Sequence, residues 1–405
     1  MRFVSNPILR SALSHAASIR EELHNFMNFS LCCNHGVIYS ICAMNSAFNP
    51  APPTEPHFDS ARGVWIVSRY DDVCAALREP ALYLSSSRGE TFPTGEDETA
   101  RSKIFAQVRN EIAQMSAGRW RSDMENAAKT VMRKVIGRPR VDILGNITQP
   151  WSAAALISLS GAPRSFAARI KNIAASLLYK KALRDLARIV NLPRALANRR
   201  FQRQSDAENH LNRLLQEKEV HVSKSMFMAV SQTLPSFLAK SWLALMRNPD
   251  QMHRLMEEPH LMPNAVEELL RYAGIVHTLH RKAIRDIQIG HAQIARDDRV
   301  KLIVRSANFD PSRFDRPHQL DIARQSRGQL SLGAGIHACA GAVMVREAFA
   351  AMTPLFLAAR PQLVKNQPIV WMGDSTLHWP LTVFVKLSPD LPKKGTRKSE
   401  RIQSN

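Results

Sequence analysis

The chain has 405 residues, of which 45% are hydrophobic, with a formal net charge of +20 and five cysteines. This apolar content is enough to bury a large core, so the chain as a whole is not disordered. No apolar stretch is long enough to cross a membrane comfortably. Five unevenly spaced cysteines do not make a disulfide scaffold, so we expect a reducing, cytoplasmic location. They are Cys32, Cys33, Cys42, Cys74 and Cys339.

Much of the positive charge lies in one stretch. Between Arg164 and Arg203 there are eleven basic residues and a single acid, Asp185. A charge of this size suits nucleic acid or an acidic protein as a partner. An acidic protein is favoured, because no aromatic-interleaved platform, zinc pattern or paired-helix reader accompanies the charge. A basic helical nucleic-acid-binding protein stays as an alternative.

The N-terminal part of the chain mixes irregular and regular patterns. Residues 1–48 show no clear period, and we expect an atypical extension ahead of the folded domain. Residues 63–70 are typical of a short strand, and residues 71–77 predict a helix with an aspartate cap. Helical spacing follows over residues 101–135.

Helical spacing continues through the middle of the chain, and a long helix is expected over residues 223–246. The other predicted helices cover residues 153–159, 165–219 with a break at Pro193, 251–257 and 264–272. No internal repeat or low-complexity linker divides this region. The pattern is typical of one mainly helical body.

The C-terminal part introduces a small amount of strand. Apolar residues between 283 and 304 suggest short strands, and residues 308–331 form an irregular segment rich in Arg, Asp and Pro. A helix is predicted from just after Cys339 to about Leu357, and residues 369–387 alternate like strands. The polar, basic tail over residues 389–405 is expected to be disordered. The sequence therefore predicts a mainly α protein with a small β region, as a single domain over residues 49–388.

One cysteine lies between glycines at the start of a helix, in the loop over residues 332–341. The loop reads Gly333-Ala334-Gly335-Ile336-His337-Ala338-Cys339-Ala340-Gly341. Backbone N–H groups and the helix dipole are expected to lower the pKa of the thiol, and glycines let a planar group approach it. A haem ligand fits this pattern, while a small buried cysteine or a nucleophile with His337 as its base are alternatives. Zinc is disfavoured, because the nearest other thiol, Cys74, lies far upstream.

Two further motifs accompany this loop. Glu268-Leu269-Leu270-Arg271 lies on a predicted helix, where a spacing of three brings the two charges to one face. The irregular segment from Ala307 to Arg324 precedes the loop. In this order the motifs resemble a bacterial soluble cytochrome P450, a haem-thiolate monooxygenase, although Leu332 stands where that family has Phe. The resemblance implies the cytochrome P450 fold.

The resemblance also implies roles for particular residues around a heme b. Cys339 would be the axial ligand of the iron, on a loop whose shape depends on Gly333, Gly335 and Gly341. Partners for the haem propionates would be His337, Arg281 and Arg109. A structural ion cluster would be formed by Glu268, Arg271 and Arg324.

The family's oxygen-activating motif aligns with Ala229-Val230-Ser231-Gln232-Thr233 on the long helix. Thr233 would stabilise bound dioxygen and supply protons, which makes Thr233 and Gln232 the candidate catalytic residues. Gln232 replaces the family's acid and cannot relay a proton as a carboxyl group would. Val230 replaces a glycine, and we expect it to crowd the space above the iron. These changes leave a peroxygenase or an inactive haem binder as an alternative function.

The resemblance implies a monooxygenase that inserts one oxygen atom from dioxygen into a small hydrophobic substrate. The chain has no flavin or nicotinamide fingerprint of its own, so electrons would come from a separate protein with its reductase. An acidic ferredoxin-type donor is expected, because the positive charge of the chain would speed that encounter. We expect no nucleic-acid partner and no membrane span.

Overall fold

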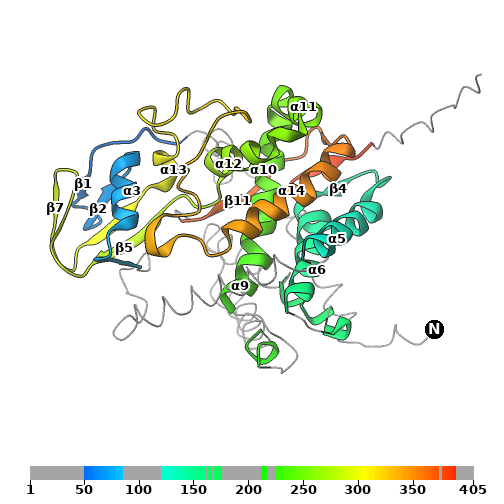
Figure 1. Ribbon diagram of the computed structural model, residues 1–405, viewed down its shortest axis with the longest axis horizontal. Coiled ribbons are helices and arrows are strands. Elements are labelled where there is room, and N and C mark those ends of the chain that lie inside the picture. Colours follow the sequence, from blue (N-terminus) through cyan, green and yellow to red (C-terminus); the bar gives the residue numbers. More distant parts are fainter. Residues whose placement is uncertain are drawn as a thin grey trace, which may run out of the picture.

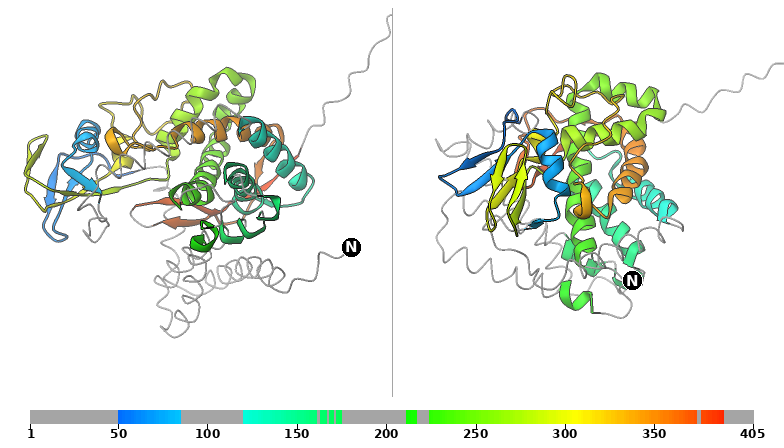
Figure 2. Two further views of the ribbon diagram at one scale, coloured as in Figure 1. Left: turned by 60° about the horizontal axis from the view of Figure 1, so that its bottom comes forward. Right: turned by 60° about the vertical axis from the view of Figure 1, so that its left-hand side comes forward.

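The computed structural model describes residues 50–84, 120–160, 163–166, 168–170, 172–174, 211–216, 224–373 and 376–388. They form a mainly helical body with a five-stranded sheet at one end (Figures 1 and 2). The predicted fold class, mainly α with a small β region, is confirmed. The predicted extension over 1–48 and tail over 389–405 lie outside the described residues, so the domain limits stay a prediction.

The five-stranded sheet has the strand order β1-β2-β8-β5-β3. Its strands are β1 (His57–Asp59), β2 (Val64–Val67), β3 (Leu82–Leu84), β5 (Leu279–Ala283) and β8 (Arg299–Leu302). The β2–β8 pair is parallel, and the other three pairs are antiparallel. The strand predicted over residues 63–70 is therefore confirmed as β2, and the sheet unites segments more than 200 residues apart.

Helix α3 (Tyr70–Arg78) packs its buried side chains with those of the sheet in a core of their own. The helix was predicted over residues 71–77, but the predicted aspartate cap within it is wrong. No side chain caps the helix at Arg69. Instead the backbone N–H of Tyr70 donates to the carboxylate of Asp310, at 2.8 Å. A residue distant in sequence thus satisfies a donor at the start of the helix, which local pattern alone cannot show.

The helical body surrounds a larger core (Figure 1). Its main helices are α5 (Trp120–Val135), α6 (Gln149–Ser160), α9 (Lys224–Met228), α10 (Leu234–Arg247), α11 (Pro249–Glu257), α12 (Met262–Ala273) and α14 (Ala342–Ala358). Helix α10 runs through the middle, where the stacked rings of Trp242 and Phe356 join it to α14 at a centroid distance of 4.0 Å. In the part of the chain that the structure describes, no helix is long and apolar enough to span a membrane.

Shorter strands and helical turns connect the helical body and the five-stranded sheet. The small sheets use β4 (Val141–Asp142), β6 (Ile287–Ile289), β7 (Ala292–Ile294), β9 (Gln362–Leu363), β10 (Val370–Gly373), β11 (His378–Thr382) and β12 (Phe384–Lys386). The short helical turns are η1 (Ile143–Thr148), η2 (Arg164–Phe166), η4 (Pro259–Leu261), α13 (Val304–Ala307) and η5 (Gly335–His337). Most of the helix predicted over residues 165–219, and the first part of that over 101–135, lie outside the described residues.

The predicted long helix over residues 223–246 is present but is not uniform. A π-helical turn, η3 (Ala229–Thr233), lies between α9 and α10. At its end the N–H of Leu234 bonds to the carbonyl of Ala229, five residues back. Isolated π turns inside α-helices are often found at functional sites. This one covers the five residues that the sequence aligned with the oxygen-activating motif.

Candidate functional site

The loop that carries Cys339 is shaped by two glycines with left-handed backbone angles. Gly333 has φ of 71° and Gly335 has φ of 68°. At Gly335 there is also no room for a side chain, because a Cβ atom would lie 2.7 Å from the carbonyl oxygen of Leu77 on α3. The backbone N–H of Cys339 donates to the carbonyl of Leu332 at 2.7 Å, and α14 begins three residues later. Backbone geometry therefore presents the cysteine at the start of a helix.

The thiol of Cys339 is exposed, so it is not the small buried hydrophobe that was one alternative. The sequence predicted a lowered pKa for this thiol, and this prediction is wrong for the protein without a metal bound to the sulfur. Although the residue has exposed surface, the protein atoms around it raise the pKa of the thiol by desolvation. The backbone N–H of Gly341 and the charge of Arg346 act in the opposite direction and offset only part of this. A metal ion at the sulfur would reverse the balance, because coordination deprotonates a thiol.

The candidate propionate partners lie on different elements. Arg281 is buried on β5, between β8 and β3, and one of its guanidinium nitrogens donates to the carbonyl of His280 at 2.9 Å. His337 lies in η5, which packs against α3. Arg109 falls outside the described residues. The structure thus describes two of the three predicted partners, one at the sheet and one in the cysteine loop.

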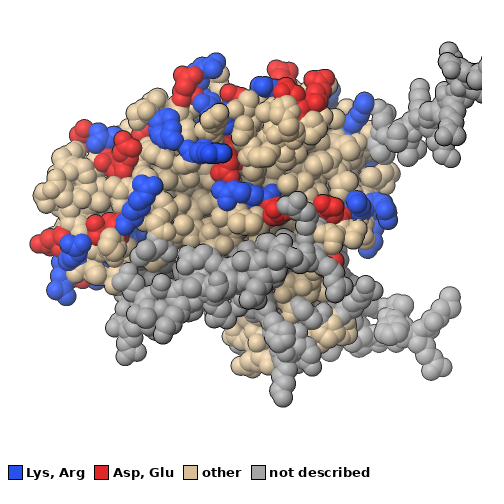
Figure 3. Space-filling model, in the orientation of Figure 1, with Lys and Arg blue, Asp and Glu red and all other residues tan. Residues whose placement is uncertain are grey.

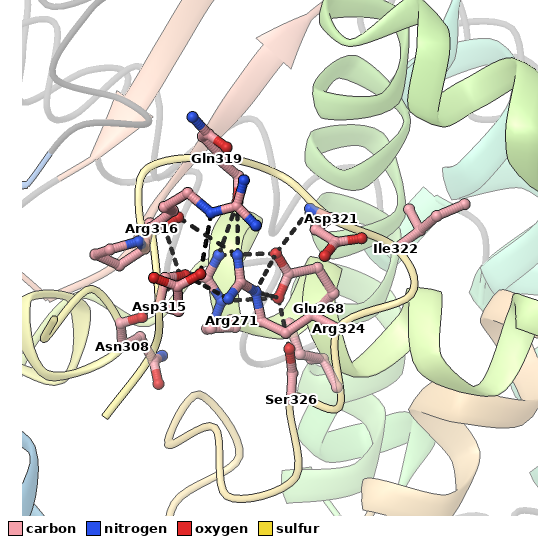
Figure 4. Close-up of polar contacts among 12 residues, drawn as sticks. Glu268, Arg271, Asn308, Asp315, Arg316, Gln319, Asp321, Ile322, Arg324 and Ser326 are labelled. Carbon is pink, nitrogen blue, oxygen red and sulfur yellow. Dashed lines mark hydrogen bonds and ion pairs between the residues drawn. The ribbon is translucent and has the colours of Figure 1, made fainter. Parts of the chain in front are cut away.

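Glu268, Arg271 and Arg324 form the cluster that the sequence pattern predicted (Figure 4). Both carboxylate oxygens of Glu268 accept from Arg271, each at 2.8 Å, and the two side chains are fully buried. The Nε of Arg324 lies 3.2 Å from the same carboxylate. A bidentate pair of this kind is both strong and geometrically specific. The cluster ties α12 to the irregular segment that leads to the cysteine loop.

Sequence reasoning missed several partners that complete this cluster. The hydroxyl of Ser326 donates to Glu268 at 2.5 Å, and the backbone N–H of Asp321 donates at 3.1 Å. Arg271 in turn donates to the carbonyls of Asn308 and Pro317 (Figure 4). These partners come from an irregular segment, where no periodic signal indicates which side chains or carbonyls turn inward.

A second acid on α12, Glu267, was also missed. Its carboxylate accepts from Arg346 in the first turns of α14 at 2.5 Å and from the side chain of Gln329 at 3.3 Å. Arg346 is the residue whose charge acts on the pKa of Cys339. Two neighbouring acids on α12 therefore have different partners. Glu268 belongs to the buried cluster, and Glu267 binds α14, the helix that follows the cysteine. A second glutamate directly before the Glu-x-x-Arg pattern was the available signal.

The five residues of the π turn differ in their hydrogen bonds and in their exposure. The hydroxyl of Thr233 donates to the carbonyl of Ala229 at 2.7 Å, and the amide of Gln232 turns back to the sulfur of Met228 at 3.6 Å. Val230 was expected to crowd open space above an iron, but it is packed in the main core at 3% exposure. The residues with accessible surface in this turn are Ala229, Gln232 and Thr233. The hydroxyl and the amide are therefore available to a ligand, and the substituted valine is not.

Comparison with known proteins gives the family. The model named "Cytochrome P450" matches residues 167–358. The chain is 27% identical to putative cytochrome P450 YjiB of Bacillus subtilis, over 74% of this chain and 83% of that protein. It is 26% identical to cytochrome P450-SU2 of Streptomyces griseolus, over 83% of this chain and 90% of that protein. The crystal structure of CYP109E1 from Bacillus megaterium with testosterone has the same fold, at a TM-score of 0.62 and 19% identity, covering 86% of this chain and 99% of that one.

The chain is homologous to bacterial members of the cytochrome P450 family, whose model covers a little under half of it. Members of this family are haem-dependent monooxygenases in which a cysteine thiolate binds the iron. The predicted family, fold, enzyme class and type of cofactor are confirmed. The residues of the cysteine loop fit that cofactor, because an exposed thiol, a Gly341 amide directed at its sulfur and two left-handed glycines offer a side-chain-free approach to the sulfur.

Proposed function

We propose that the protein is a monooxygenase that inserts one oxygen atom into a small hydrophobic substrate, with haem bound through Cys339. The observation that carries the proposal is the exposed Cys339 thiol on a glycine-shaped loop, with a fully buried ion cluster holding the segment behind it. When bound, the haem supplies the oxygen chemistry, in which two electrons and two protons turn dioxygen into water and a hydroxylated product. The protein's own residues bind, orient and exclude water.

Cys339 has the role of holding the iron, and its backbone has the role of keeping the sulfur in place. The Cys339 N–H is bonded to Leu332, and the Gly341 N–H is directed at the sulfur, where it stabilises negative charge. Glu268, Arg271 and Arg324 keep the approach to the loop fixed. A fixed approach favours one position of the sulfur relative to the rest of the chain.

Arg281 and His337 are proposed to bind the haem propionates. A guanidinium suits a carboxylate because it presents two parallel N–H donors. Burial of Arg281 in the sheet holds its side chain in a narrow range of positions. Arg109 is proposed as a third propionate partner from sequence alignment alone.

Thr233 is proposed to position dioxygen and to pass on protons through its Oγ1. That hydroxyl now donates to Ala229, which leaves its oxygen lone pairs available to accept from water or a ligand. Gln232 orients a water or ligand through hydrogen bonds, because an amide cannot release a proton at ordinary pH. Protons must therefore reach Thr233 through water and not through the side chain next to it.

Electrons are proposed to come from a separate acidic ferredoxin-type protein with its reductase. The net charge of +20 favours attraction of an acidic partner. On the face drawn in Figure 3, the basic and acidic side chains of the described residues are interspersed. We expect the electron-transfer rate to fall as ionic strength rises, and a rate insensitive to salt would contradict this partner.

The test of the proposed function begins with the absorbance of the reduced protein under carbon monoxide. A thiolate-ligated haem gives a strongly red-shifted band, and haem-loaded protein without that band would refute the ligand. Turnover of small lipophilic compounds is then compared with a ferredoxin system and with peroxide. Ferredoxin-driven product formation supports the monooxygenase. Peroxide-driven turnover alone would favour the peroxygenase alternative, which Gln232 motivates.

A further inference from the structure

A lysine is fully buried in the middle of helix α10. Lys240 on α10 has 0% exposure. Its ammonium nitrogen lies 3.0 Å from the carbonyl of Gly274, 3.0 Å from the carbonyl of His378 and 3.2 Å from Nε2 of His277. One side chain therefore joins α10 to two other segments, the connection after α12 and strand β11.

A second buried cation extends this cluster. Arg305 on α13 lies 2.6 Å from the same His277 Nε2. An arginine can only donate, so Nε2 is the acceptor and the ring is neutral. Burial, Lys240 and Arg305 all lower the pKa of His277, which agrees with this state. The His277 ring also stacks on His378 at 4.9 Å.

The cluster is not explained by stability. Removing a cation from water is costly, and burial with a nearby Arg305 holds the pKa of Lys240 well below its usual value. A Met of similar length would fill the same volume without that cost. What Lys240 provides and Met does not is a set of directed hydrogen bonds to fixed backbone atoms.

Lys240 is linked to the proposed haem site on two sides, through the backbone of Gly274 and along its own helix. Gly274 starts the connection from α12 to Arg281 on β5, and it is crowded against Ser331, next to the cysteine loop. A Cβ atom at Gly274 would lie 2.3 Å from the Ser331 hydroxyl. Lys240 on α10 follows Thr233, the last residue of η3, by seven residues, so both lie on one face of the long helix, about 10 Å apart along its axis.

We propose that Lys240 is a positioning residue that sets the spacing between the long helix of η3 and α10, which carries Thr233, and the segment 274–281, which carries Arg281. As far as it concerns the haem pocket, this inference rests on the proposed function. Through its hydrogen bonds to Gly274 and His277, the lysine holds the segment 274–281 at a fixed distance from the helix that carries Thr233. Without the lysine both elements stay folded, but the segment between Gly274 and Arg281 can move.

The test compares Lys240→Met with Lys301→Met, a control that removes a half-buried lysine from β8. Hydrogen exchange of the peptide spanning 274–281 in the haem-containing protein is expected to accelerate about tenfold in Lys240→Met and not in the control. Imidazole, titrated by absorbance, is expected to bind about tenfold more weakly, because the pocket is less preorganised. The carbon monoxide band of the reduced protein is expected to stay where it is in the wild type.

Each outcome decides the inference. Exchange and imidazole affinity within twofold of the wild type would overturn it, and faster exchange with unchanged affinity would overturn the link to the pocket. Should Lys240→Met not fold, His277→Leu and His277→Gln carry the test. Gln keeps an acceptor near the Nε2 position, so only His277→Leu should reproduce the effect, and equal behaviour of the two would contradict the proposal. A wild type without the thiolate band would refute the proposed function, while the exchange result would still report on Lys240.

Discussion

The segment behind Cys339 and the π turn that contains Thr233 are held in opposite ways. Behind the cysteine, Glu268 accepts from Arg271, Arg324, Ser326 and the backbone of Asp321, all within 3.2 Å. In the π turn, Thr233 donates to its own helix and the Gln232 amide donates to the sulfur of Met228 at 3.6 Å. The segment behind the cysteine is thus fixed by side chains from several segments, and the π turn by its own backbone. Substitutions in the cluster behind the cysteine are therefore expected to lower stability, and substitutions in the π turn are expected to change activity.

In this comparison of the two regions, the largest effect is expected at the sulfur of Cys339. Cys339→Ser removes the thiolate, so the red-shifted carbon monoxide band should disappear completely from the reduced protein. Absorbance spectra of haem-reconstituted protein check this. Cys74→Ser is the control, because that buried thiol lies on α3 beside Arg78, and its loss should leave the band unchanged. A band that survives in Cys339→Ser would mean that another residue binds the iron.

The buried cluster should give the next largest effect, on stability. Glu268→Gln leaves Arg271 buried without its carboxylate, and breaking such a pair costs about 3–5 kcal/mol of unfolding free energy. Urea titration followed by circular dichroism measures this. Glu267→Gln is the matched control on the next residue, where the partner Arg346 is 41% exposed and the expected cost is at most about 1 kcal/mol. Equal costs for the two variants would contradict a special role for the buried cluster.

The π turn should respond in activity and not in stability. Gln232→Glu supplies a proton-relaying group beside Thr233, and we expect ferredoxin-driven turnover to rise about 10²-fold, the lower end of general acid contributions. Product formation per electron consumed is the measurement. Thr233→Val keeps the side-chain shape without the hydroxyl and is expected to cancel the gain. Turnover unchanged in Gln232→Glu would show that protons already reach the site by another route.

The smallest expected effect is a pH dependence of stability from the Lys240 cluster. Burial first, then Lys240 and Arg305, lower the pKa of His378 to about 3. The unfolded histidine takes up a proton near pH 6.5, so unfolding binds protons at lower pH. The free energy of unfolding should therefore be highest above about pH 7 and fall as the pH is lowered towards about 3. Urea titrations at several pH values check this, and His378→Phe, which keeps the ring stack, should reduce the slope and leave the part that His277 contributes.

The sequence predicted the main elements because periodicity and short motifs act locally. Glu268 and Arg271 meet because three residues separate them on a helix, and the strand at Val64–Val67 follows from its own residues. The cap at Tyr70 was missed because Asp310 supplies it from the other half of the chain. Lys240 was missed because a lysine inside an apolar helix pattern looks like one tolerated polar residue. Only the fold shows that Gly274, His277 and His378 converge on it.

The π turn also has a consequence for how the long helix is aligned and engineered. A turn closed by a bond between Ala229 and Leu234 holds one residue more than an α-helical turn. That extra residue rotates everything after it by about 100° relative to an uninterrupted helix. Deleting a single residue from the turn would therefore restore an ordinary helix while leaving the side chains of α9 and α10 on their present faces. The turn absorbs a difference of one residue in length, and a sequence alignment with an uninterrupted helix that allows no gap at this point assigns the wrong face to one half of the helix.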